Sequence, residues 1–144
     1  MAIWQFDFYV VPKKNYIKGE DFSNEYILSW SQYDISLVEI DFLDKEKSWS
    51  NSIVQYGQID ETCIKFRYEN KKLEEISCRL DLRSISKVIL NKILDYIKNI
   101  DGMIIYEGNI YDPNVDDILN LIKSSKAYKF CKEPMKVFEE LSNS

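Results

Sequence analysis

Two runs of alternating apolar and polar residues flank the segment ENKK and constrain the fold more than any other feature of the chain. In the first run, Ile64, Phe66 and Tyr68 alternate with Cys63, Lys65 and Arg67; in the second, Ile76, Cys78, Leu80 and Leu82 alternate with Ser77, Arg79, Asp81 and Arg83. A period of two predicts strands with one buried face, and therefore a β-hairpin over 61–69 and 73–83. Its turn holds Asn70 but no glycine, which favours a four-residue type I connection over a tight primed turn.

Outside residues 14–60, the rest of the chain predicts two further strands and three helices. Residues 3–11 alternate and predict a strand that Pro12 ends, and the segment MIIYE predicts another strand. A helix is expected over 84–100, with Ser84 as its N-cap and Gly102 as its left-handed stop. Asp112-Pro113 predicts a helix start with Asp as N-cap, and a short helix is expected near Pro134.

Residues 14–60 give a less regular pattern. SNEYILSW predicts a helix that starts at Ser23, SLVEIDFL alternates as a strand does, and SWSNSIVQYG predicts a loop that leads into a short strand. The order of elements indicates a single α+β domain over 1–144. Its antiparallel sheet would carry helices on one face, a layout compatible with a ferredoxin-like fold. Residues 14–60 would leave the other face open or cover part of it.

The composition removes several classes of chemistry. The chain of 144 residues has no histidine and only four glycines, which excludes Ser-His-Asp and Cys-His nucleophilic systems, a P-loop and a dinucleotide fingerprint. Its three cysteines, Cys63, Cys78 and Cys131, are too few for a four-ligand zinc site or a disulfide framework. Cys63 and Cys78 are expected on opposite faces of the sheet. The sequence therefore predicts no enzyme, no cofactor and no metal.

The expected location is the cytoplasm. No apolar run approaches the roughly 20 residues that a membrane-spanning helix requires, and the N-terminus has no positive region before its apolar part. The net charge of −5 disfavours nucleic acid as a partner, because binding phosphate needs a basic surface.

Two surfaces are candidates for binding a protein. Arg79, Asp81 and Arg83 are expected on one face of the sheet with Lys65 and Arg67, and Asp81 would lie between the two arginines. The face is either a solvated surface or a recognition surface. Residues 20–46 hold eight carboxylates against Lys45 alone, either as a solvated segment or as a landing site for a basic protein. The candidate partner-binding residues are Glu39, Asp41, Asp44, Glu46, Trp49, Arg79, Asp81 and Arg83.

Four segments carry a resemblance: WQFDFYVVP, SWS at 48–50, RLDLR at 79–83 and SSKAYKFCKEP. In these the chain resembles a broad set of small uncharacterised bacterial proteins, some of which resemble immunity proteins of toxin–immunity systems. The resemblance implies a cytosolic, non-enzymatic protein that binds and occludes a cognate toxin, and it carries over no catalytic residue. Two alternatives stay open: a self-associating structural or regulatory protein, and a carboxylate-based enzyme without histidine.

Overall fold

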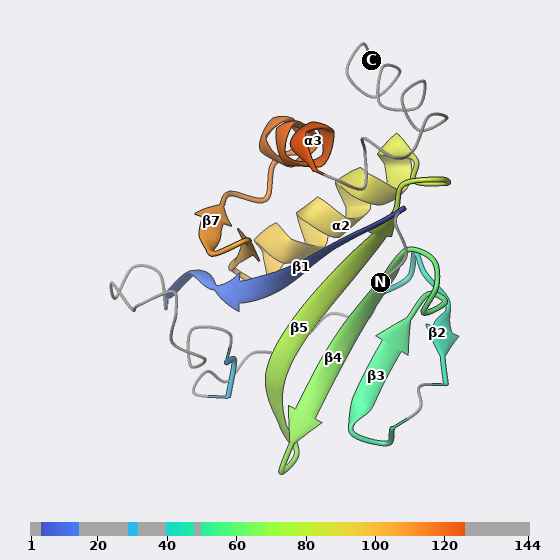
Figure 1. Ribbon diagram of the computed structural model, residues 1–144. Helices are drawn as coiled ribbons and strands as arrows, with labels where there is room; N and C mark the ends of the chain where they lie inside the picture. Colours follow the sequence, from blue (N-terminus) through green and yellow to red (C-terminus); the bar gives the residue numbers. More distant parts are fainter. Residues whose placement is uncertain (1–3, 15–28, 32–39, 48–49, 126–144) are drawn as a thin grey trace.

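The computed structural model describes residues 4–14, 29–31, 40–47 and 50–125, and Figure 1 shows their arrangement. Within these residues, seven strands form one antiparallel sheet in the order β2-β3-β4-β5-β1-β6-β7, accompanied by helices α2 and α3. The strands are β1 (Gln5–Pro12), β2 (Lys45–Glu46), β3 (Ile53–Tyr56), β4 (Cys63–Glu69), β5 (Lys72–Asp81), β6 (Gly102–Tyr106) and β7 (Asn109–Tyr111). The helices are α2 (Lys87–Asn99) and α3 (Val115–Ser124). The predicted α+β class is confirmed.

The connection from β5 through α2 to β6 skips one position in the sheet. Both strands pair antiparallel with β1, which lies between them, so β5 and β6 run parallel to each other. This is a split β-α-β unit, the building block of the ferredoxin-like layout. A second helix, which that layout needs, would be expected between β1 and β2. Most of this segment lies outside the described residues, so the ferredoxin-like layout stays a prediction.

Both helices lie on the same side of the sheet (Figure 1). Leu90, Ile93 and Ile97 of α2 and Ile118 and Ile122 of α3 are buried in one apolar cluster with the inward side chains of the strands. The strands contribute Phe6, Phe8, Val10, Ile64, Phe66, Ile76, Cys78 and Leu80 to this cluster. The helix-covered face is therefore the main core, as the alternation predicts. No helix in the described ranges is long and apolar enough to cross a membrane.

The hairpin between β4 and β5 follows the prediction, but its turn does not. Glu69 pairs with Lys72, so the loop consists of Asn70 and Lys71 alone, with φ angles of 52° and 65°. Two consecutive left-handed residues are the signature of a type I′ turn. The expected four-residue connection is wrong, because the twist of paired strands favours the primed turn even where lysine replaces the usual glycine.

The predicted helix boundaries also move. The N-cap of α2 is Ser86, whose Oγ accepts a bond from the amide of Ile89 at 3.2 Å, and not Ser84. The amides of Ser84 and Ile85 instead bond to the carbonyl of Asp81 and form a turn after β5.

The other predicted caps are displaced by one or two residues. The left-handed stop after α2 is Asp101, with φ of 60°, while Gly102 begins β6. Asn114, not Asp112, caps α3 by accepting a bond from the amide of Asp117 at 2.8 Å.

Several other expectations concern the ends of the chain and residues 14–60. The first strand continues through Pro12, which pairs with Gly102, and β3 confirms the short strand expected in SWSNSIVQYG. In SLVEIDFL, the described residues 40–43 form no strand. The helix expected from Ser23 lies outside the described residues except for residues 29 and 30, which are not helical. The helix expected near Pro134 lies outside them, as does Cys131.

Candidate protein-binding face

The sheet has a second face, opposite the helices, and the strand register places one row of side chains across it. Directly paired residues in antiparallel strands point to the same side. The row runs Glu46, Gln55, Lys65, Ser77, Tyr9, Ile105 and Ile110 from β2 to β7. Cys63, Arg79 and Asp7 form the neighbouring row on this face, while Cys78 points to the helices. The prediction that the two cysteines lie on opposite faces is confirmed.

All three guanidinium nitrogens of Arg79, on this face, donate hydrogen bonds within the protein. Its Nε and Nη2 donate to Oδ1 and Oδ2 of Asp7 at 2.9 and 3.1 Å, and its Nη1 donates to the carbonyl of Ile59 at 2.7 Å. The hydrogen bonds to Asp7 raise the pKa of Arg79, although partial burial opposes the shift. The guanidinium therefore joins β5, β1 and the loop after β3, and it presents little surface to a partner.

Asp81 is buried and belongs to a different pair. Only 2% of the residue is exposed, and its carboxylate accepts bonds from Nε and Nη2 of Arg83 at 3.0 and 2.9 Å and from the Arg83 amide at 2.9 Å. The guanidinium of Arg83 lies 4.1 Å from the centre of the Trp4 ring, a cation–π contact. The expected ladder, with Asp81 on a solvated face between two arginines, is wrong: each arginine has its own carboxylate.

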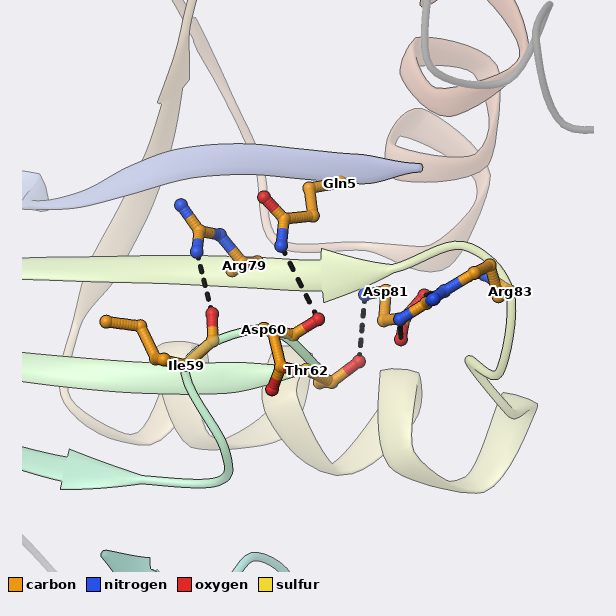
Figure 2. Close-up of polar contacts among 7 residues, drawn as sticks. All are labelled: Gln5, Ile59, Asp60, Thr62, Arg79, Asp81 and Arg83. Atoms are coloured by element: carbon orange, nitrogen blue, oxygen red, sulfur yellow. Dashed lines mark hydrogen bonds and ion pairs between the residues drawn. The ribbon is translucent and has the colours of Figure 1, made fainter. Parts of the chain in front are cut away.

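The loop 57–62 contributes hydrogen-bond partners for Arg79 and for the amide of Asp81 within the protein. Figure 2 shows the loop held against β1 and β5, where Arg79 reaches Ile59, Gln5 donates to the carbonyl of Asp60 at 3.4 Å, and the Asp81 amide donates to Oγ1 of Thr62 at 3.0 Å. Cys63, which follows the loop, has no exposed surface, and its burial raises the pKa of the thiol. The loop 57–62 therefore covers one end of the second face.

Beside this loop the second face contains a small hollow of about 160 Å³. It is lined by Asp7, Phe8, Tyr9, Lys65, Ser77, Cys78 and Arg79. Tyr9 is 43% exposed although it lies on the inner strand β1, and Lys65 forms no ion pair with any residue that the structure describes. The sequence alternation predicts that Lys65 and Tyr9 lie on this face. It does not predict the hollow, because the hollow depends on where the loop 57–62 ends.

The acidic candidates lie at a different place. Asp41 and Asp44 are exposed, and Glu46 is half-buried on the edge strand β2. With the strand spacing of about 4.8 Å, β2 is roughly 14 Å from β5, so these carboxylates and the arginines do not form one cluster. Glu39 and Trp49 lie outside the described residues.

Two further carboxylates, absent from the sequence-based candidates, extend the acidic region. Asp60 and Glu61 are exposed on the loop 57–62, which is joined to the start of β2 by a 2.7 Å bond from the Gly57 amide to the Asp44 carbonyl. We call segments 40–47 and 57–62 the acidic rim. It holds five carboxylates against Lys45 and Lys47, a net charge of −3.

The comparisons with known proteins assign no family: the chain matches no family model, no curated protein and no solved structure. Within the described ranges, no group of three or more Cys, Asp or Glu residues is placed to hold a metal ion. The chemistry of the site therefore rests on the second face and the acidic rim themselves.

Proposed function

We propose that this protein is a non-catalytic binding module that uses the second face of its sheet to hold a basic protein partner. The observation that carries the proposal is the exposure of Tyr9 on that face, on the inner strand β1. The resemblance to immunity-like bacterial proteins supports a basic toxin as the partner and the cytoplasm as the place of binding.

Tyr9 has the properties of an interface anchor. Tyrosine is enriched at the centres of protein interfaces, where a large ring contributes contact area at a small loss of side-chain entropy. The backbone of Tyr9 is paired on both sides, with Ser77 of β5 and Ile105 of β6, so its position is set before a partner arrives. An anchor on a rigid strand binds without the additional ordering that a loop requires.

The acidic rim supplies charge complementarity for a basic partner. Its exposed carboxylates Asp44, Asp60 and Glu61 form no ion pair with any described residue. A local field of this sign accelerates the approach of a basic protein and loses its effect as salt rises. The rim would steer the partner, and the second face around Tyr9 would fix its register.

The two alternatives receive less support from the geometry. The edge strands β2 and β7 have two and three residues, and such short edges are poor templates for pairing a second copy. Catalysis by carboxylates uses a pair of acids, whereas the hollow contains one, Asp7, which is held by Arg79.

Affinity capture from the protein's own host, with nuclease treatment, tests the proposal. We expect a basic protein that is retained after nuclease treatment, lost with Tyr9→Ala, and retained with Val88→Ala, which truncates the exposed Val88 on the helix side. The double variant Asp44→Lys with Asp60→Lys should slow association while the dissociation rate changes little. Capture that survives Tyr9→Ala in a folded variant would contradict the assignment of the second face, and a bait that retains no protein would contradict the function.

A further inference from the structure

We propose that the hollow on the second face is a binding site for a single carboxylate group, with Lys65 as its cation. No part of the proposed function requires such a site, and the inference stands without a protein partner. It rests on the charge, the polar groups and the volume of the hollow.

The charge of the lining is set by Lys65. The two other ionised side chains in the lining, Arg79 and Asp7, neutralise each other through two hydrogen bonds, and the remaining Arg79 nitrogen, Nη1, donates to the Ile59 carbonyl. Lys65 alone contributes an uncompensated positive charge among the described residues of the lining. A group with one negative charge therefore balances the hollow.

The position of the neighbours favours the same ligand. Lys65, Ser77 and Tyr9 are directly paired across β4, β5 and β1, so three side chains that carry an ammonium or a hydroxyl group leave the sheet side by side on one face and line the hollow. Each of the three groups can donate a hydrogen bond to a carboxylate. The bond from the charged ammonium is stronger than a bond from a neutral hydroxyl. A dianion such as phosphate would leave the hollow with a net negative charge, because Lys65 is the one uncompensated cation among the residues of its lining.

The volume limits the size of the ligand. About 160 Å³ is well below the roughly 300–1,000 Å³ of sites that enclose drug-sized molecules. The hollow accepts a group the size of one side chain, with the Tyr9 ring available to cover an apolar part. The carboxylate has two sources: a free small aromatic acid, or a glutamate side chain presented by a protein.

Titrations of isotope-labelled protein followed by the amide signals of residues 9, 65 and 77 test the site. The probes are sodium benzoate and its uncharged match benzamide, and glutamate with both ends blocked and its match, blocked glutamine. We expect the carboxylate of at least one pair to shift these signals while its amide match does not. Benzoate alone would identify a free acid as the source, and blocked glutamate alone would identify a side chain.

Two lysine variants separate the site from general attraction. Lys65→Met should weaken carboxylate binding by about tenfold or more, and Lys92→Met, which removes an exposed charge from α2, should leave it unchanged. Equal shifts with acid and amide in the unchanged protein, or no shift with either acid, would overturn the inference even if Lys65→Met fails to fold. Neither result would affect capture of a protein partner through Tyr9, so the two proposals fail separately.

Discussion

Arg79 and Asp7 face each other across β5 and β1, joined by two hydrogen bonds of 2.9 and 3.1 Å. The same arginine holds the loop 57–62 through Ile59, above a cysteine with no exposed surface. The sequence alternation predicts that Arg79 is a surface charge. Its hydrogen bonds instead hold the loop 57–62 against one end of the sheet. The arginines of RLDLR make their contacts within the fold, and the surface that we propose for a partner lies beside them.

Replacing Arg79 should destabilise the protein much more than replacing a surface arginine. Arg79→Ala leaves Asp7 and the Ile59 carbonyl without their donor, and we expect a loss of about 1–3 kcal/mol in the free energy of unfolding. The loss for Arg79→Lys should be smaller than that for Arg79→Ala and larger than that for replacing a surface arginine, because an ammonium cannot form the two-pronged pair. Urea unfolding measures each value.

Arg67→Ala is the matched control for this prediction. Arg67 pairs with Glu69 and Glu75 at the surface, with 41% of its side chain exposed, and should lose less than about 1 kcal/mol. Equal losses for the two alanine variants would show that the Arg79 network is no stronger than an ordinary surface ion pair.

Removing the buried carboxylate of Asp81 should open the turn after β5. Asp81→Ala deletes the acceptor of the Arg83 amide and releases the guanidinium that stacks on Trp4, and we expect a loss of about 1–3 kcal/mol. Asp81→Asn keeps an acceptor for the amide and should lose less. Urea unfolding compares both with Asp41→Ala, an exposed position where little change is expected. If Asp81→Ala left the free energy of unfolding unchanged, the turn would be held by backbone bonds alone.

The sequence predicts the fold class and the faces of the strands because both depend on local periodicity. The alternation of Ile64, Phe66, Ile76 and Cys78 assigns the core face correctly, since one face of this sheet is covered by helices. It fails for Asp81, whose polarity indicates solvent, because a long-range contact from Thr62 and the returning Arg83 side chain enclose it.

The candidate site is likewise predicted from the sequence only where it depends on local pattern. Lys65 and Tyr9 are placed on the second face by sequence pattern, and the exposure of Asp41 and Asp44 follows from their charge. The hollow and the addition of Asp60 and Glu61 to the acidic rim depend on how the loop 57–62 folds back across β5. No local pattern encodes a contact between Ile59 and Arg79, twenty residues apart, so this part of the site required the structure.

The type I′ turn offers a stabilising substitution. Lys71 has a φ of 65°, a region in which a side chain is unfavourable and glycine is not. Lys71→Gly should therefore raise the free energy of unfolding by about 1 kcal/mol, measured by urea unfolding. Lys71→Ala removes the charge but keeps the Cβ atom, and it should give no such gain. Equal stabilisation by both variants would attribute the effect to charge and contradict the backbone argument.

Tyr96 should make the protein less stable in strong alkali. Burial on α2, with Tyr56 and Tyr68 nearby, raises the pKa of Tyr96 from 10 to about 12. The folded state therefore retains a proton that the unfolded chain loses between these values. The stabilisation from neutral Tyr96 is complete below about pH 10 and is lost as the pH rises to about 12.

The expected size and the control follow from this linkage. At about 1.4 kcal/mol per pKa unit, the loss attributable to Tyr96 is of the order of 2 kcal/mol. Urea unfolding of the unchanged protein and of Tyr96→Phe across this pH range measures the effect, since the variant has no proton to lose at position 96. The stability difference between the two should be constant below about pH 10 and should shift in favour of the variant above it. Parallel profiles would mean that Tyr96 ionises equally well in both states, and that its environment is more hydrated than its 8% exposure indicates.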